Sequence, residues 1–250
     1  MRAYVGTSGW QYSSWRGRFY PDRLPQRAWL AFYAKRFATV EVNATFYHLL
    51  PRRSFEGWRD VLPEGFVVAV KASRYLTHVR RLSDPREPVG RISEAASGLG
   101  EKLGPVLYQL PPHFPCDVGL LAGLLAVLPA GQRPAFEFRD PSWFVTEAEE
   151  MLIRRGAARV VADRRGKRDA FPASMRFAYV RFHEGERGPG YSRAALAAWA
   201  EELSGLDVEE IFCYFNNDTD AWAPRNALLL MDLLARRGVE VARPLEAGSS

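Results

Sequence analysis

One stretch of the sequence indicates the fold most clearly: Arg176-Phe177-Ala178-Tyr179-Val180-Arg181-Phe182-His183. It is short, rich in aromatic residues and bounded by polar ones, which is typical of a β-strand. After Ser192 the apolar residues recur at helical spacing, and a second apolar stretch follows at residues 210–216. A strand, a crossover helix and another strand make the unit from which parallel sheets are built.

The same unit repeats along the rest of the chain. Strands are predicted at residues 3–7, 39–43, 66–71, 105–110, 134–139, 158–163, 176–183 and 210–216. Helical patterns separate them, except that the connection from Asp163 to Arg176 is short and polar. Eight such units predict an α/β fold of the TIM type, a (β/α)8 barrel whose sixth helix is short or missing. We expect a single barrel domain over residues 1–238 and a loosely held tail over residues 239–250.

An open, doubly wound sheet is the alternative to a barrel. Such a sheet has a glycine-rich phosphate-binding loop after its first strand. The loop here reads Gly6-Thr7-Ser8-Gly9-Trp10 and lacks the third glycine at the required spacing. The barrel is therefore the better interpretation, and a length of 250 residues is normal for it.

The overall composition gives little guidance to the partners. The chain has 34 basic and 29 acidic residues, so its net charge is only +5, which is weak support for nucleic-acid binding. Its two cysteines are too few for a disulfide framework, and it opens on a strand with no leader before it. No apolar run approaches membrane-spanning length. These features lead us to expect a cytoplasmic protein that does not bind membranes.

Polar groups collect at the ends of the predicted strands, where barrels of this type carry their active sites. The residues at those ends are Thr7, Ser8, Glu41, Asn43, Lys71, Gln109, Glu137, Arg139, Asp163, Arg181, His183, Asn216 and Asn217. Residues two apart in a strand point to the same face of the sheet. The two residues of each of these pairs therefore share a face: Glu41 with Asn43, Glu137 with Arg139, and Arg181 with His183. Buried charges cost several kcal/mol each unless they are paired. We therefore predict a functional site here, the alternative being an ion-pair network that only holds the barrel together.

The sequence resembles the YecE-like family of barrel proteins nearly from end to end. The stretches that carry the resemblance are Gly6-Thr7-Ser8-Gly9-Trp10, Val40-Glu41-Val42-Asn43, Thr45-Phe46-Tyr47, Leu110-Pro111-Pro112, Phe136-Glu137-Phe138-Arg139, Tyr179-Val180-Arg181-Phe182-His183 and Tyr214-Phe215-Asn216-Asn217-Asp218. One departure is Glu184, because the family usually has glycine directly after the histidine of the strand-7 motif. This departure leaves the path of the following loop open. The resemblance implies the barrel fold and no particular reaction.

We assign candidate roles to the strand-end residues by their chemistry. Glu41, Glu137 and His183 are the candidate catalytic groups, because carboxylates and imidazole transfer protons. The candidate substrate-binding residues are cations, amides and aromatic side chains, namely Asn43, Lys71, Arg139, Arg181, Asn216, Asn217, Trp10 and Tyr47. No metal site is predicted, because no close pair of ligands exists and three cations share the mouth of the barrel. No cofactor is predicted either.

Several roles stay open at this stage. Each carboxylate could simply be paired with a cation, Glu137 with Arg139 being the obvious case, and the aromatic side chains could pack over the top of the barrel. Lys71 could hold an anion or, if desolvated, form a Schiff base with a carbonyl group. The glycine-rich loop after His183, together with Arg181, also predicts an anion site near the seventh and eighth strands.

These residues favour an enzyme that uses acid/base chemistry on a small anionic substrate, bearing phosphate or carboxylate, bound at the carboxyl-end mouth of the barrel. Hydrolysis, isomerisation or elimination would each suit them. The alternative, from another class, is a non-catalytic nucleic-acid-binding protein that uses surface arginines within residues 74–81, 154–168 and 236–237. The sequence leaves the oligomeric state undecided.

Overall fold

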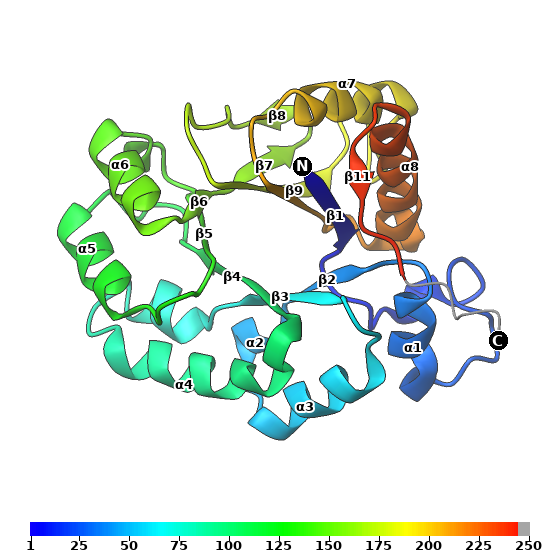
Figure 1. Cartoon of the computed structure of the whole chain (residues 1–250), viewed down its shortest axis with the longest axis horizontal. Coiled ribbons are helices and arrows are strands. Elements are labelled where there is room, and N and C mark those ends of the chain that lie inside the picture. Colours follow the sequence, from blue (N-terminus) through cyan, green and yellow to red (C-terminus); the bar gives the residue numbers. More distant parts are fainter. Residues whose placement is uncertain (245–250) are drawn as a thin grey trace.

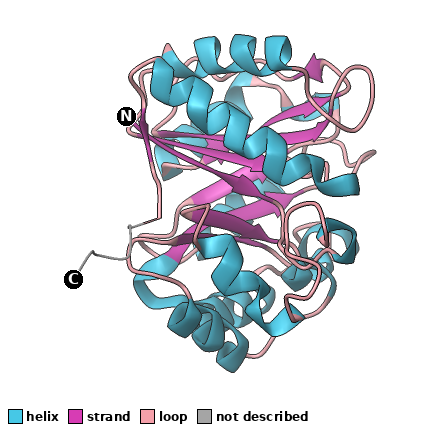
Figure 2. Ribbon diagram, turned by 90° about the vertical axis from the view of Figure 1, so that its right-hand side faces the viewer, coloured by secondary structure: helices cyan, strands magenta, loops and turns pink. Residues whose placement is uncertain are grey.

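The computed structural model describes residues 1–244 and has an α/β architecture. Figure 1 shows the strands around the centre with helices outside them, and Figure 2 shows the same arrangement from the side. The strands are β1 (Arg2–Thr7), β2 (Thr39–Val42), β3 (Val67–Lys71), β4 (Leu103–Gln109), β5 (Pro134–Glu137), β6 (Ala158–Arg159), β7 (Val161–Arg164), β8 (Lys167–Arg168), β9 (Phe177–Glu184), β10 (Glu210–Phe215) and β11 (Glu240–Val241).

The helices fall between the strands. The α-helices are α1 (Trp29–Ala34), α2 (Ala44–Tyr47), α3 (Arg52–Val61), α4 (Arg86–Ala96), α5 (Val118–Val127), α6 (Thr146–Arg155), α7 (Arg193–Ser204) and α8 (Trp222–Arg236). Short 3₁₀ turns are η1 (Ser13–Trp15), η2 (Gln26–Ala28), η4 (Ser97–Lys102), η5 (Pro141–Trp143) and η6 (Thr219–Ala221), and η3 (Tyr75–Val79) is a π-helix. None of the described helices combines the length and apolar character that crossing a membrane requires.

Helix ends follow from local side-chain chemistry. The side chain of Asp117 accepts from the N–H of Leu120 at 3.0 Å at the start of α5, and Ser192 accepts from Ala195 at 3.1 Å at the start of α7. These bonds satisfy N–H groups that have no partner inside the helix. Gly156 ends α6 in the left-handed conformation, with φ of 66°.

The strands pair into two sheets, and nearly all of the pairs are parallel. One sheet has the order β2-β3-β4-β5-β6, and the other has the order β11-β1-β10-β9-β7-β8. Within the described residues, the antiparallel strand pair is β7 with β8. Each of the eight predicted strands is present, but the pairing gives two sheets where the sequence predicts one closed sheet.

The two sheets approach each other at two borders. The predicted sixth strand is split into β6, which pairs with β5, and β7, which pairs with β9. At the other border Ser8 and Glu41 form a single parallel bridge. The Tyr33 hydroxyl also links β1 to β2, because it accepts from the N–H of Thr7 at 2.9 Å and donates to the carbonyl of Thr39 at 3.0 Å. The carboxyl end of β1 is thereby held against the start of β2.

The connection after β7 contains no helix. Residues 165–176, all of which the structure describes, form loops and the short strand β8. Strand β8 folds back on β7, with Asp163 opposite Arg168. A two-residue strand in a polar segment has no recognisable period, which is why the sequence did not indicate it.

The last described residues differ from the loosely held tail that the sequence predicts. Strand β11 pairs with β1, and the N–H of Ala242 donates to the carbonyl of Ala3 at 2.8 Å. Val239 and Ala242 are buried. Residues 239–244 are therefore attached to the sheet, and the rest of that predicted tail, residues 245–250, lies outside the described residues.

An inner layer of buried side chains is shared by the two sheets. Strands β9 and β10 contribute large aromatic residues to this layer, and β3, β5 and β6 contribute small alanines. The layer consists of Tyr4, Ala38, Ala69, Leu107, Ala135, Ala158, Val160, Phe177, Tyr179, Phe212, Tyr214 and Ala242. On β9, Arg181 follows Tyr179 by two residues and shares its face. The apolar layer therefore ends directly at a set of polar side chains.

Gly6 lies in β1 where this strand meets β2. A Cβ atom on this residue would lie 2.3 Å from the carbonyl oxygen of Thr39 and 3.0 Å from the hydroxyl of Tyr33. We expect Gly6→Ala to push the strands apart and to lower the free energy of unfolding by about 1–3 kcal/mol. Urea unfolding followed by circular dichroism measures this loss. Gly123→Ala is the control, because a Cβ there meets no atom within 4 Å; an equal loss in both variants would contradict the steric argument.

Candidate functional site

Five strands bring buried polar side chains to one edge of the sheets. These residues are Glu41 on β2, Lys71 on β3, Gln109 on β4, Glu137 on β5 and Arg181 on β9, and each is less than 10% exposed. The parallel register places Gln109 beside Glu137. Because parallel strands end at the same edge of a sheet, residues that are far apart in sequence meet there.

Arg181 joins the two glutamates into what we call the buried ion cluster: Glu41, Glu137 and Arg181. Nη2 of Arg181 donates to Oε1 of Glu41 at 2.8 Å, and Nη1 donates to Oε2 of Glu137 at 2.6 Å. Arg181 is 1% exposed and both glutamates are fully buried. The planar guanidinium group can serve two carboxylates at once, since its N–H groups point in fixed, separate directions.

Glu41 is held by two further donors. The hydroxyl of Ser8 lies 2.7 Å from Oε1, and the hydroxyl of Tyr179 lies 2.6 Å from Oε2. Burial, and then the charge of Glu41, raise the pKa of Tyr179 well above its ordinary value, so this hydroxyl keeps its proton and donates. The sequence placed Ser8 among the polar strand-end residues but assigned it no role, and it did not indicate Tyr179. One signal could have found Tyr179, because it shares a face with Arg181.

Glu137 is surrounded by cations. Nε of Arg139 lies 3.3 Å from Oε1, and the guanidinium group of Arg164 contacts the same oxygen. Nε2 of Gln109 donates to Oε2 at 2.8 Å. Burial alone would raise the pKa of Glu137, but Arg181, with Arg139 and Arg164, holds it well below its usual range. Glu137 is therefore a carboxylate at neutral pH and a poor proton acceptor.

Lys71 lies beside the buried ion cluster without a carboxylate of its own. Its Nζ donates to Oε1 of Gln109 at 2.9 Å and lies 3.9 Å from the centre of the Phe46 ring. The ion pairs found among residues 1–244 do not include Lys71, because both nearby glutamates are bound by Arg181. Burial, and then the charge of Arg181, lower the pKa of Lys71 to about 8. A useful fraction of the amine is therefore uncharged near neutral pH.

His183 faces Glu137 from the end of β9. Its Nε2 lies 3.8 Å from Oε1 of Glu137 and is buried with no hydrogen-bond partner in the described part of the chain. The side-chain amide of Asn216 lies 3.2 Å from Nδ1. An amide that donates to Nδ1 leaves the ring proton on Nε2. Burial, and then Arg181, lower the pKa of His183 to about 3, so the ring is neutral at physiological pH.

The site as a whole has more positive than negative charge. Besides the two buried carboxylates it contains four cationic side chains, which are Lys71, Arg139, Arg164 and Arg181. The side chains of Arg139 and Arg164 are 32% and 38% exposed, so an anion that arrives from solvent meets these guanidinium groups first. Within residues 1–244, no three His, Cys, Asp or Glu side chains gather as metal ligands would.

Comparison with known proteins assigns the family. The family described as "Protein of unknown function DUF72" matches residues 4–249. The chain belongs to the DUF72 family. It is 28% identical to the UPF0759 protein YunF of Bacillus subtilis, over 92% of this chain and 94% of that protein. It is also 28% identical to the UPF0759 protein YecE of Escherichia coli K12, over 68% of this chain and 62% of that protein. The resemblance to the YecE-like family is thereby confirmed.

Solved structures of DUF72 proteins have the same fold. A DUF72 protein from Thermotoga maritima superposes with a TM-score of 0.82 at 29% identity, over 94% of this chain and all (100%) of that one. A DUF72 protein from Enterococcus faecalis superposes with a TM-score of 0.77 at 18% identity, over 93% of this chain and 95% of that one. The structure named SacUVDE superposes with a TM-score of 0.55 at 11% identity, over 95% of this chain and 98% of that one. This likeness shows similarity of fold alone.

Two predicted binding residues of this DUF72 chain have structural contacts, and a third is exposed. Trp10 is 5% exposed and packs edge-on against Trp58, with ring centres 5.4 Å apart. The side-chain amide of Asn217 donates to the carbonyl of Pro189 at 2.6 Å and so fastens the loop after β9. Tyr47 is the opposite case, because it is 71% exposed and points away from the core. Of these three residues, Tyr47 is the one whose exposed side chain is free to touch a large ligand.

Some buried polar atoms at the strand ends lack a partner in the described part of this DUF72 chain. Three of them are Oδ1 of Asn43, Nε of Arg181 and Nε2 of His183, and Oδ1 of Asn217 is another. Asn43 follows β2 directly and precedes α2. Buried polar groups almost always have hydrogen-bond partners, and exceptions often mark a place for a ligand or an ordered water. The three atoms are therefore consistent with a binding position at this edge of the sheets.

The glycines after β9 serve packing in this DUF72 chain. A Cβ atom on Gly185 would lie 2.0 Å from the carbonyl oxygen of Gly190, and one on Gly190 would lie 2.4 Å from the Trp222 ring. Arg181, which the sequence suggested as the anion partner there, directs both terminal nitrogens to the glutamates. An anion site at the loops after β9 and β10 stays a prediction, and the exposed cations Arg139 and Arg164 follow β5 and end β7.

Some of the surface arginines that nucleic-acid binding would use are paired with acids. Examples from the three groups are Arg80 with Asp84, Arg154 with Glu150, and Arg237 with Glu201. A paired guanidinium group has less charge to offer to phosphates. Nucleic-acid binding by this DUF72 chain therefore stays a prediction, to be tested by the salt dependence of any affinity.

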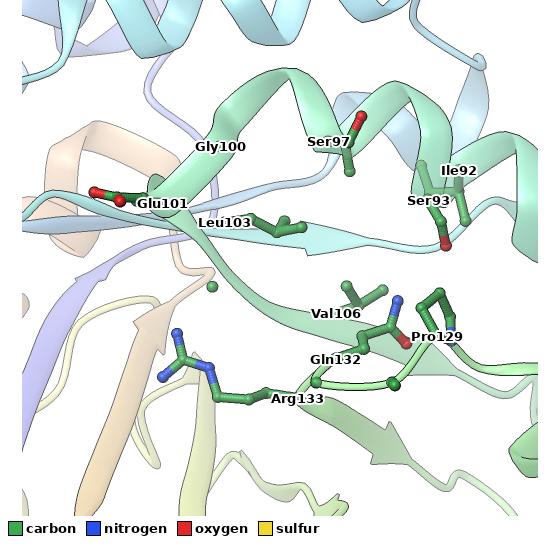
Figure 3. Close-up of a pocket in the computed structure, with 14 residues that line it drawn as sticks. Ile92, Ser93, Ser97, Gly100, Glu101, Leu103, Val106, Pro129, Gln132 and Arg133 are labelled. Atoms are coloured by element: carbon green, nitrogen blue, oxygen red, sulfur yellow. The ribbon is translucent and has the colours of Figure 1, made fainter.

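A hollow of about 410 Å³ lies at the opposite ends of the strands, between the end of α4 and the starts of β4 and β5 (Figure 3). Its lining includes aliphatic side chains such as Ile92 and Val106, and Arg133 is bound to Glu210 at 2.6 Å. No cluster of titratable groups like that at the carboxyl ends lines it. We therefore place the candidate site of this DUF72 chain at the carboxyl ends.

Proposed function

We propose that this chain is an enzyme that performs acid/base chemistry on a small anionic substrate, bearing phosphate or carboxylate, at the carboxyl ends of its strands. The observation that carries the proposal is the excess of cations over carboxylates around the buried ion cluster. The two cations that reach solvent, Arg139 and Arg164, can bind an anion through paired N–H groups. A network that served stability alone would have no need of the excess charge.

We further propose that the two sheets act together as one TIM-type barrel. Supporting this, β6 and β7 pass from one sheet to the other, and the bridge between Ser8 and Glu41 joins the remaining border. Barrel enzymes bind their substrates at the carboxyl ends of the strands. A cytoplasmic location also belongs to the proposal, because Cys116 and Cys213 are both free thiols.

The roles follow from the charge state of each group. Lys71, with a pKa of about 8, can give up or accept a proton near neutral pH. Neutral His183 offers its Nε2–H to a substrate oxygen. Glu137 was a candidate base in the sequence, but its lowered pKa favours a different role, in which it positions the arginines around the substrate.

Binding of inorganic phosphate tests the proposal. We expect isothermal titration calorimetry at low salt to detect phosphate, and the double variant Arg139→Gln/Arg164→Gln to weaken its affinity at least about tenfold, because charge-assisted hydrogen bonds are lost. Arg154→Gln is the matched control, since Arg154 is an exposed arginine paired with Glu150 on α6. Equal affinities in the double variant and the parent protein would reject the anion site.

A further inference from the structure

Lys71 stands in surroundings that do not suit a permanent ammonium ion. Its side chain is nearly buried, and both neighbouring carboxylates are bound by Arg181. An ammonium group has several N–H donors to satisfy, yet within residues 1–244 Nζ makes a single hydrogen bond, to Oε1 of Gln109 at 2.9 Å. Gln109 is itself fixed, because its Nε2 donates to Glu137 at 2.8 Å. The side-chain oxygen of Gln109, Oε1, must therefore face Lys71.

We propose that Lys71 is a nucleophile that forms an imine with the carbonyl carbon of an anionic aldehyde, ketone or 2-oxo acid. This inference rests on the proposed function, because Arg139 and Arg164 would hold the anionic end of the same substrate. An uncharged amine that gives one N–H to Gln109 keeps its lone pair available for attack. The face of the Phe46 ring, 3.9 Å from Nζ, can then stabilise the protonated imine.

The step balances without an additional reagent. Nζ bonds to the carbonyl carbon as the π bond of the carbonyl breaks, and one N–H proton moves to the oxygen to give a carbinolamine. The hydroxyl then leaves with the second N–H proton as water, and the C=N bond forms. The lowered pKa of Lys71, about 8, supports the attack, because the free amine at pH 7 is more than about 100-fold more abundant than in an ordinary lysine.

Two small ketones, pyruvate and acetone, serve as probes, because they share the carbonyl group and differ in charge. Each is incubated with the full chain at pH 7 and sodium cyanoborohydride, which reduces an imine to a stable amine that peptide mass spectrometry locates. The chain has four lysines, Lys35, Lys71, Lys102 and Lys167, and exposed Lys35 is the internal control. We expect pyruvate to label Lys71 at least about tenfold faster than Lys35.

Variants separate imine formation from anion binding. The double variant Arg139→Gln/Arg164→Gln should slow the labelling of Lys71 by pyruvate at least about fivefold and leave labelling by acetone unchanged. Lys71→Met should bind phosphate and lose the pyruvate label at this position, with circular dichroism as the check on folding. If pyruvate labels Lys71 no faster than Lys35, the proposal that Lys71 forms an imine is overturned. If phosphate still binds in that case, only the imine is rejected; if it does not, the proposed function fails as well.

Discussion

Replacing Arg181 with Met is expected to lower the free energy of unfolding by about 3–5 kcal/mol. The guanidinium group is 1% exposed and is hydrogen-bonded to two fully buried carboxylates. Its removal leaves Glu41 without an ion-pair partner among the described residues, in a site that water reaches poorly, whereas Glu137 keeps Arg139 and Arg164. Breaking a buried pair by removing one partner costs far more than the pair contributes, because the remaining charge is uncompensated. Urea unfolding at pH 7 measures the loss.

Two further variants show whether the buried charge is the cause. Arg139→Met removes another partner of Glu137, but this side chain is 32% exposed, so the loss should be at most about 1 kcal/mol. Combining Arg181→Met with Glu41→Gln removes the carboxylate that has lost its cation, while Glu137 keeps Arg139 and Arg164, and should recover much of the stability. A loss below about 1 kcal/mol in Arg181→Met would contradict the role of the buried ion cluster in folding.

The stability of the protein should fall as the pH drops from 7 to 5, and His183 should account for about 2 kcal/mol of the fall. The pKa of His183 is lowered to about 3 in the folded chain, against about 6.5 in the unfolded chain. Between these values the unfolded chain binds a proton that the folded chain does not. Acid therefore favours unfolding throughout this window, by about 1.4 kcal/mol per pH unit.

His183→Gln isolates this contribution. The variant cannot take up the proton, so its free energy of unfolding, measured in urea at several pH values, should fall less steeply than that of the parent protein. His78 adds a smaller contribution of the same sign. Burial and then Lys71 lower its pKa to about 4, and its ring is less deeply buried than that of His183. Glu137 acts only at lower pH, because its stabilising charge is lost as the pH falls through its depressed pKa. Parallel curves for variant and parent between pH 7 and 5 would disprove the role of His183.

Local pattern predicted the eight strands and the cluster that ends them. The two-residue period of β9 placed Arg181 and His183 on one face, and the ends of two other strands indicated Glu41 and Glu137. In the structure Arg181 contacts both glutamates, and His183 lies beside Glu137. These features could be predicted because a strand fixes which side chains share a face, and parallel strands fix which ends meet.

The remaining contacts depend on partners that no local pattern reveals. Arg164 reaches Glu137 because the chain turns back at β8, a strand of two residues in a polar segment. Trp10 is buried because Trp58, from α3, lies against it. Which cations surround a carboxylate, and which aromatic rings leave the surface, is decided by the packing of distant segments, and the sequence alone therefore left these roles open.

The position of β1 has a consequence for biosynthesis. Strands β2 to β6 pair in the order in which the ribosome makes them, so that sheet can form while the rest of the chain is still being synthesised. Strand β1 instead pairs with β10 and β11, which follow the other described strands in the chain. Apart from its single bridge to β2, strand β1 therefore stays unpaired until β10 and β11 have been made. A nascent chain of this kind exposes a strand edge for most of its synthesis, which is the interval in which aggregation and chaperone binding compete with folding.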